Sequence, residues 1–276
     1  MPIYPLRQLN PSDASVALYD RWLGDIEESL ARGDDRWELC RRVLTGLYYP
    51  GLAGTAPASL SLDTQVALAQ MDARNVTLEP EYYAEVDVER FQANKPLLWM
   101  WQMFDRSPLG GNVHLGVRFR RALAPHLFAR VGKNFKCFHF VEFSYGYNLE
   151  VGDDVVVHRN VLLDDRGGIV LGDKVSISDY ANIYSHTHSI VDQADVSNLK
   201  TVIGDGVRIT YHATVLAGTQ VGENAMVGAM ALATKDVRPY HVNVGIPAKS
   251  VRVKPNAPPE AYKVTLRKDG EGDGND

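Results

Sequence analysis

The sequence predicts a mainly β protein: a parallel β-helix of about five coils, preceded by an α-helical N-terminal region. Two observations predict this fold. From Val131 onward apolar residues recur every six positions, whereas residues 1–130 contain no repeat. A chain of 276 residues, of which 45% are hydrophobic and 23% charged, is long enough to bury the core that such a stack of coils needs.

The six-residue period has a simple physical meaning. Each group of six forms one short strand followed by a tight corner, and three groups make one triangular coil, which cannot bury its apolar positions unless coils stack. We call the first residue of each group the anchor. The anchors are all apolar: Val131, Cys137, Phe143, Val151, Val157, Leu163, Leu171, Ile177, Ile183, Ile203, Ile209, Val215, Val221, Val227 and Ala233. Residues four positions after an anchor are mostly small or apolar: Val155, Val161, Val175, Ala181, Val207, Ala213, Ala225 and Ala231.

This register divides the repeats into five coils, at 131–148, 151–168, 171–188, 203–220 and 221–238. Two residues are added before Val151 and two before Leu171. A 14-residue insertion, Ser189 to Val202, interrupts the stack after the third coil and is rich in Asp, Ser and Asn. Because insertions into a repeat stack form surface loops that often build the binding face, we expect this loop to border the functional site.

Upstream of the repeats, several segments have the pattern of helices. Asp13 to Arg32 is amphipathic and follows a capping Ser12 or Asp13. The other expected helices run from Asp34 or Asp35 to about Leu47, from Asp63 to Arg74, and over 113–130 with a break at Pro125.

The most apolar stretch, Pro96 to Phe104, is too short to span a bilayer. We expect it to be a buried helix that contains Trp99, Trp101 and Phe104. The alternative is an anchor at a membrane surface, helped by Arg118, Arg120 and Arg121.

These patterns give three parts: a helical region over 1–112, the β-helix with an extended cap over 113–254, and a disordered acidic tail over 255–276. The net charge of −5 argues against a general nucleic-acid binder. Cys40 and Cys137 are too few for a disulfide framework, and the N-terminus lacks the apolar core of a signal peptide, so we expect a cytoplasmic protein.

Four segments resemble the hexapeptide-repeat acyltransferases, closest to the sugar O-acetyltransferases of the maltose, galactoside and polysaccharide-assembly type. They are NVLLDDRGGIVLGDKVSIS (160–178), IYSHTH (183–188), VIGDGVRI (202–209) and TKDVRPYHVNVGIPAKSVR (234–252). The resemblance covers roughly residues 113–254. It implies a left-handed β-helix, a homotrimer with sites between subunits, acetyl-CoA or another acyl-CoA as co-substrate without a metal, and transfer to a saccharide hydroxyl. The alternative acceptors are a xenobiotic such as an antibiotic and the nitrogen of an amino sugar.

The resemblance also places the general base of this family at His188. A neutral imidazole suits this task, because the attacking hydroxyl must lose its proton at cytoplasmic pH. His188 lies five residues after anchor Ile183, so we expect it to point outward; otherwise it is a solvated surface residue. His186 also faces outward and would orient His188, contact substrate, or have no role. His212 is expected at the surface or at a subunit contact; the alternative is that it lines the same cleft.

By the same resemblance, Asn160, Asp164 and Asp165 lie near the acceptor pocket. A carboxylate there would bind sugar hydroxyls or hold an imidazole tautomer. The alternative is that the Asp residues simply make a corner turn. Arg166 follows them and would neutralise the pair.

For CoA, the resemblance implies small residues on the last coils and basic side chains for the phosphates. The matching positions are Tyr211, Ala229, Thr234, Lys235, Lys249 and Arg252. Two positions depart from the family: Arg208 stands where Trp is frequent, and Tyr211 where a small residue is common. Cys137 is an anchor, and no Ser or Cys lies beside a base in a suitable turn, so the pattern favours direct attack over covalent catalysis.

Two other functions remain open from the sequence. One is a zinc hydrase of the gamma-carbonic-anhydrase type, with three ligands drawn from His158, His186, His188 and His212. The other is a trimeric scaffold without catalytic activity. The His-x-His spacing and the TKD…GIPAK ending argue against the hydrase, and the polar loop beside His188 argues against the scaffold.

Overall fold

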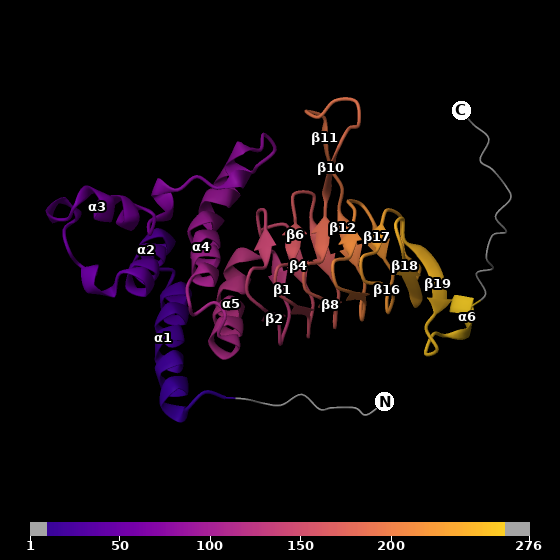
Figure 1. Ribbon diagram of the computed structural model, residues 1–276, viewed down its shortest axis with the longest axis horizontal. Helices are drawn as coiled ribbons and strands as arrows, with labels where there is room; N and C mark the ends of the chain where they lie inside the picture. The colour runs from indigo at the N-terminus through magenta and orange to yellow at the C-terminus, as the bar shows by residue number, and fades with distance from the viewer. Residues whose placement is uncertain (1–9, 263–276) are drawn as a thin grey trace.

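The computed structural model describes residues 10–262, with the helices first and the β-helix after them (Figure 1). The helical region covers the first end of the β-helix, and α5 leads directly into the first coil. The helices are α1 (Asp13–Arg32), α2 (Arg36–Tyr48), α3 (Leu62–Ala69), α4 (Val88–Arg106) and α5 (Val113–Leu127). Short 3-10 turns lie at Pro50–Leu52, Pro57–Ser59, Ala73–Asn75 and Glu79–Tyr82.

The first two helices begin where the capping residues predict. The Ser12 side chain accepts a hydrogen bond from the backbone N–H of Ser15, and α1 ends at Gly33 in the left-handed conformation (φ 75°). The Asp35 side chain accepts from the N–H of Trp37 and starts α2. The helix expected over Asp63 to Arg74 is shorter than predicted, because α3 ends at Ala69 and a separate 3-10 turn follows.

Pro125 does not break α5 where we predicted, because the helix continues for two further residues, to Leu127. The apolar stretch at Pro96 is the second half of a longer helix, α4, which begins at Val88. Trp101 and Phe104 are buried, and the Trp101 indole donates to the carbonyl of Val141 at 3.0 Å. The interpretation as a buried helix is therefore confirmed. No helix within residues 10–262 combines the length and apolar character that a bilayer crossing requires.

The strands stack into three parallel sheets, one for each side of the coil, and a separate hairpin projects from the stack (Figure 1). The first sheet has the order β1 (Arg130–Val131), β4 (Leu149–Val151), β7 (Ile169–Leu171), β12 (Thr201–Ile203) and β15 (Gln220–Val221). The second has β2 (Lys136–Cys137), β5 (Val156–Val157), β8 (Ser176–Ile177), β13 (Arg208–Ile209), β16 (Met226–Val227), β18 (His241–Val244) and the antiparallel β19 (Lys249–Val253). The third has β3 (Glu142–Phe143), β6 (Leu162–Asp164), β9 (Asn182–Tyr184), β14 (Thr214–Val215) and β17 (Leu232–Ala233).

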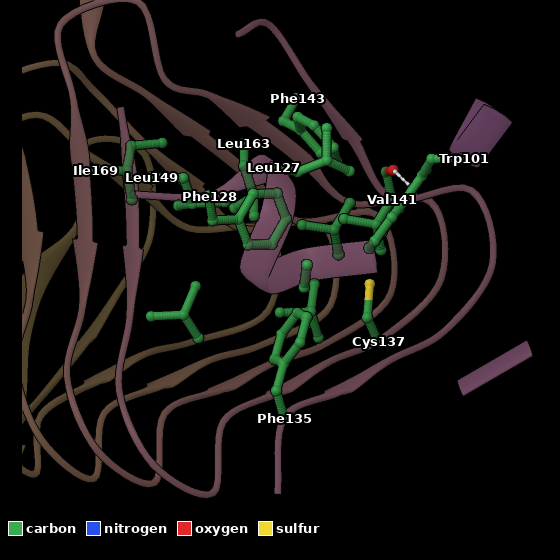
Figure 2. Packing of buried hydrophobic residues seen from close by; sticks show 14 of the residues in the cluster. Trp101, Leu127, Phe128, Phe135, Cys137, Val141, Phe143, Leu149, Leu163 and Ile169 are labelled. Carbon is green, nitrogen blue, oxygen red and sulfur yellow. Dashed lines mark hydrogen bonds between the residues drawn. The ribbon is translucent and has the colours of Figure 1, made fainter. Parts of the chain in front are cut away.

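The predicted anchors form the core of this β-helix. Fourteen of the fifteen are buried, and the first, Val131, is half-buried. Anchors also face each other across the strand pairs, as Val151 does with Leu171 and Ile177 does with Ile209. At the first end of the stack, the core continues into aromatic residues that pack against the helices, with Trp101, Phe128 and Phe143 in contact (Figure 2).

The stack has about six turns, one more than predicted. The additional turn arises because β18 pairs in parallel with β16 and continues the second sheet. The segment that we expected to be an extended cap is this strand together with β19. A short helix, α6 (Pro259–Tyr262), lies in the stretch that we expected to be disordered. The rest of the predicted tail, 263–276, lies outside the described residues.

Two corners of the coil are built by residues with positive φ, which repeat once per turn. One series is Asn134, Asp154, Lys174, Gly206, Asn224 and Tyr240, and the other is Phe140, Asn160, Tyr180, His212 and Met230. The left-handed region favours Gly and Asn. The aromatic residues and Met at these corners therefore adopt it at a cost in conformational free energy, which contacts between neighbouring coils must offset. In the second series, the rings of Tyr180 and His212 stack at 4.9 Å with an interplanar angle of 3°.

The third corner carries the insertion, which is an antiparallel hairpin of β10 (His186–His188) and β11 (Val196–Asn198). The hairpin begins three residues earlier than the predicted insertion. Ser185 is therefore the last residue inside the coil, where it is fully buried. His186 and His188 belong to the projecting hairpin and not to the end of the third coil.

Candidate active site

An open cleft of about 830 Å³ lies where three parts of the chain meet. One wall is the segment 79–85, which connects the N-terminal helices and which we call the acceptor wall. The opposite side is the hairpin, with Ala194, Asp195 and Val196. Arg166 and the two predicted imidazoles, His186 and His188, complete the lining.

His188 is exposed on β10 and lies in this cleft. Its Nδ1 atom is 2.7 Å from the carbonyl oxygen of Gln193 in the hairpin loop. A carbonyl oxygen only accepts, so Nδ1 carries the proton and Nε2 keeps a free lone pair in the neutral ring. The hairpin thus holds the imidazole in the tautomer that a general base requires.

His186 is held differently, by a buried carboxylate. Its Nδ1 forms a hydrogen bond with Asp164, whose carboxylate also accepts from the hydroxyl of Ser144 at 2.9 Å. Asp164 is only 3% exposed, so this contact is largely shielded from water. The rings of His186 and His188 are 5.3 Å apart and nearly perpendicular. The cleft therefore contains two imidazoles, each with Nδ1 bound to an acceptor.

Asp165 and Asn160 do not line this cleft within one chain. Asp165 is fully buried, and its carboxylate accepts from the backbone N–H groups of Tyr145 (2.8 Å) and Asn148 (3.3 Å). Burial raises the pKa of Asp165 to about 6, against the effect of these hydrogen bonds. Asn160 lies on a different corner, at φ 56°.

Arg166 does not neutralise the Asp pair as expected. Its guanidinium binds Glu85 of the acceptor wall, with Nε 2.7 Å from the carboxylate, and it lies over the ring of Tyr83 at 3.9 Å. Burial alone would raise the pKa of Glu85, but the bonds from Arg166 outweigh it and the pKa lies below its usual value. The prediction was wrong because Arg166 binds Glu85, a carboxylate 81 residues earlier in the chain, instead of the Asp pair.

The predicted CoA residues are exposed on the last coils. Tyr211 and Ala229 lie at the same corner of adjacent coils, where the N–H of Met230 donates to the carbonyl of Tyr211 at 2.9 Å. Thr234 and Lys235 follow β17, and Lys249 and Arg252 lie on β19. None of the three basic side chains forms an ion pair with any residue in the range 10–262, so all are available to bind phosphates. Arg208 is exposed on β13.

Comparisons with known proteins identify acetyltransferases as relatives of this chain. No family model matches the chain. A galactoside O-acetyltransferase of Escherichia coli (strain K12) is 29% identical over 140 residues, which are 49% of this chain and 69% of that protein. A provisionally named acetyltransferase of Staphylococcus aureus (strain MRSA252) is 31% identical over 148 residues, or 51% of this chain and 72% of that protein.

Solved structures show the same fold. A maltose O-acetyltransferase from Clostridium difficile 630 has 27% identity and a TM-score of 0.54, and the match covers 63% of this chain and 91% of that chain. A galactoside acetyltransferase solved with coenzyme A has 24% identity and the same TM-score, and covers 62% and 85%. The chain therefore belongs to the hexapeptide-repeat acyltransferases. It is an acetyltransferase, and a galactoside and a maltose O-acetyltransferase are among the proteins it resembles.

The two rival functions are not favoured by these findings. Across residues 10–262, no group of three His, Cys, Asp or Glu side chains is arranged to hold a metal ion. His158 and His212 stack on Phe138 and Tyr180, away from the hairpin that carries His186 and His188.

Sequence reasoning missed the acceptor wall. Its residues Glu79, Tyr82, Tyr83 and Glu85 line the cleft, yet they precede the repeats by about fifty positions and follow no periodic pattern. The one available signal was a cluster of acidic and tyrosine residues between predicted helices, which by itself indicates only a polar loop.

Proposed function

We propose that this protein is an acetyl-CoA-dependent O-acetyltransferase that moves an acetyl group to a hydroxyl of a sugar or sugar-containing acceptor. The observation that best supports the proposal is the hydrogen bonding of His188 in the cleft. Its ring faces an open cleft with Nδ1 bound to the Gln193 carbonyl, which leaves Nε2 ready to accept a proton. The galactoside and maltose acetyltransferases among the relatives support a sugar acceptor.

In the proposed reaction, Nε2 of His188 takes the proton of the acceptor hydroxyl as its oxygen attacks the thioester carbonyl. An ester C–O bond forms, the C–S bond breaks, and His188 returns the proton to the departing thiolate. His186, fixed by Asp164, would contact the acceptor beside His188. Cys137 is not a nucleophile in this scheme, since it is buried and burial raises the pKa of its thiol.

Acetyl-CoA would supply the activated acyl group. The donor set fits a phosphate-rich ligand, because Lys235, Lys249 and Arg252 are exposed cations on the last coils. Small side chains such as Ala229 leave room for the pantetheine arm against the coil. Thr234 and Tyr211 complete the proposed CoA-binding residues.

We also propose a homotrimer with its sites between subunits, in the cytoplasm. One corner of the coil supports this, because three of the five side chains that follow one another along it are apolar and exposed: Phe140 (40%), Tyr180 (45%) and Met230 (62%), with Asn160 and His212 between them. A monomer would leave these three side chains in water. In a trimer, Asn160 on the same corner would approach a neighbour's cleft, which is how it would reach an acceptor.

The first experiment is calorimetric titration of the full chain with CoA and acetyl-CoA, with Lys249→Ala/Arg252→Ala as the test variant and Lys200→Ala as the control. We expect micromolar binding that the double variant weakens. Release of CoA thiol is then measured with galactosides and other saccharides, for the wild type and His188→Ala. The absence of CoA binding by the wild type would contradict the proposal.

A further inference from the structure

We propose that the acceptor wall selects the acceptor by charge: the cleft takes saccharides that are neutral or carry an amine, and discriminates against those with a carboxylate or phosphate near the reacting hydroxyl. This inference rests on the proposed function and names its acceptor class. It is drawn from the contacts of Glu79, Tyr82, Arg166 and Asp195, all of which line the cleft with His188.

The only guanidinium or ammonium group among the described residues that line the cleft is Arg166, and it is already occupied. Its side chain is 5% exposed, it is bound to Glu85, and it lies over the ring of Tyr83. An anionic acceptor would have to displace Glu85 and remove the guanidinium from an aromatic face. Arg166 therefore fixes the acceptor wall to the coil and does not bind anions from solution.

Two further carboxylates in the cleft form no ion pair with any residue in the range 10–262. Glu79 accepts a hydrogen bond from the hydroxyl of Tyr83, and Asp195 forms no ion pair with another described residue. Burial, and then the hydrogen bond to Glu79, raises the pKa of Tyr83 to about 12, so the phenol stays a neutral donor. With Arg166 balanced by Glu85, the lining keeps the negative charge of Glu79 and Asp195.

Tyr82 gives the wall a surface for a sugar ring. Tyr82 is 81% exposed and borders the cleft, so its ring is accessible to a ligand there. The C–H face of a pyranose packs well against an aromatic face, and the phenol hydroxyl can bond a sugar hydroxyl at the edge. The acceptor wall thus offers a ring contact and acidic groups together.

The test uses three β-galactosides that differ only in the charge of the aglycone: 2-aminoethyl, 2-hydroxyethyl and carboxymethyl. Acetyl transfer is followed by CoA thiol release, and binding of each galactoside is measured separately by calorimetry. We expect kcat/KM for the aminoethyl compound to exceed that for the carboxymethyl compound about tenfold at low salt, as two carboxylates within several ångströms would give. At 0.5 M NaCl the ratio should shrink to about threefold.

Substitutions in the cleft test whether Glu79 and Asp195 cause the charge preference. Glu79→Gln/Asp195→Asn should bring the ratio near one, whereas Glu27→Gln, an exposed acid on α1, should leave it unchanged. Tyr82→Ala should raise KM for all three compounds about tenfold and change kcat less than twofold. Tyr82→Phe keeps the ring, so its KM values should stay close to those of the wild type. These readouts separate charge selection from a general loss of folding.

Equal kcat/KM for the three galactosides would overturn the inference and leave the acetyltransferase function intact. Normal CoA binding without transfer to any of the three would count against the proposed galactoside-type acceptor, and the calorimetric affinities would then decide the charge preference alone. Tighter binding of the carboxymethyl compound than of the aminoethyl compound would also overturn it.

Discussion

The Nδ1 atom of His188 lies 2.7 Å from the carbonyl oxygen of Gln193, five residues further along the same hairpin. The hairpin therefore does more than line one side of the cleft, because its backbone fixes the tautomer of the proposed base. A histidine without this bond would exchange between tautomers and orientations, whereas His188 keeps its proton on Nδ1.

Removal of this imidazole should abolish most of the activity without affecting CoA. For His188→Ala we expect kcat to fall by about 10²–10⁴, the usual range for loss of a general base. CoA affinity should stay within about twofold, because the predicted phosphate-binding residues lie on β19 and after β17. The control is His114→Ala on α5, which should keep wild-type activity. Activity of His188→Ala above a tenth of the wild type would remove His188 from the mechanism.

Asp164 should act through His186, so its substitution should change acceptor binding as well as the rate. Asp164→Asn replaces the carboxylate that holds Nδ1 of His186 by a neutral amide, so the imidazole loses a charge-assisted hydrogen bond. KM for the acceptor should therefore rise severalfold, while CoA affinity stays unchanged. We expect kcat at neutral pH to fall about tenfold.

The matched control for Asp164 is Ser144→Ala, which removes its other hydrogen-bond partner and keeps the charge. This variant should leave KM for the acceptor unchanged. An unchanged KM in Asp164→Asn, together with a lower melting temperature in both variants, would indicate that Asp164 only supports the corner.

The sequence allowed the β-helix to be predicted because each anchor repeats one physical condition, an apolar side chain over the one below, as with Ile177 and Ile209. The hairpin boundary was placed three residues late, since His186 and His188 continue the alternation of the preceding strand. The acceptor wall was not predictable, because the contact of Glu85 with Arg166 depends on how the helices dock and leaves no local pattern.

The basic residues on the last coils should contribute to CoA affinity through charge. Lys249→Ala/Arg252→Ala should weaken CoA binding about tenfold to a hundredfold at 0.05 M salt, because phosphates lose two cationic partners. At 0.5 M salt the difference should become several times smaller. Calorimetry at both salt concentrations measures this difference in affinity. The control is Lys200→Ala, because Lys200 pairs with Glu150 away from β19. Equal affinities at low salt would place the phosphates elsewhere.

The exposed corner should be the subunit contact. Met230→Lys puts a charge on the corner that exposes Phe140, Tyr180 and Met230, so the trimer should dissociate at micromolar concentration while each chain stays folded. Light scattering after size-exclusion chromatography gives the mass, and circular dichroism checks the fold. Leu18→Lys, an equally exposed site on α1, is the control. A wild type that is already monomeric would refute the proposed trimer.

Asp165 should make the stability of the protein depend on pH. Its pKa is about 6 in the folded chain because the carboxyl is buried, whereas an unfolded chain has an Asp pKa near 4. The folded state therefore binds the proton more tightly. The stability from this site is present in full below about pH 4 and is lost as pH rises through about 6, with a total loss of about 3 kcal/mol.

An asparagine side chain cannot ionise, so the Asp165→Asn variant should not show this loss of stability with rising pH. The free energy of unfolding of Asp165→Asn minus that of the wild type should rise as pH increases from 5 to 7.5, as measured by urea denaturation at several pH values. The absolute difference also contains the bonds to the N–H groups of Tyr145 and Asn148, one of which an amide cannot replace, so the slope is the decisive quantity. Asp63→Asn, an exposed acid on α3, should show no such slope. A flat or falling difference would mean that Asp165 is ionised throughout this range and that its two backbone donors outweigh burial.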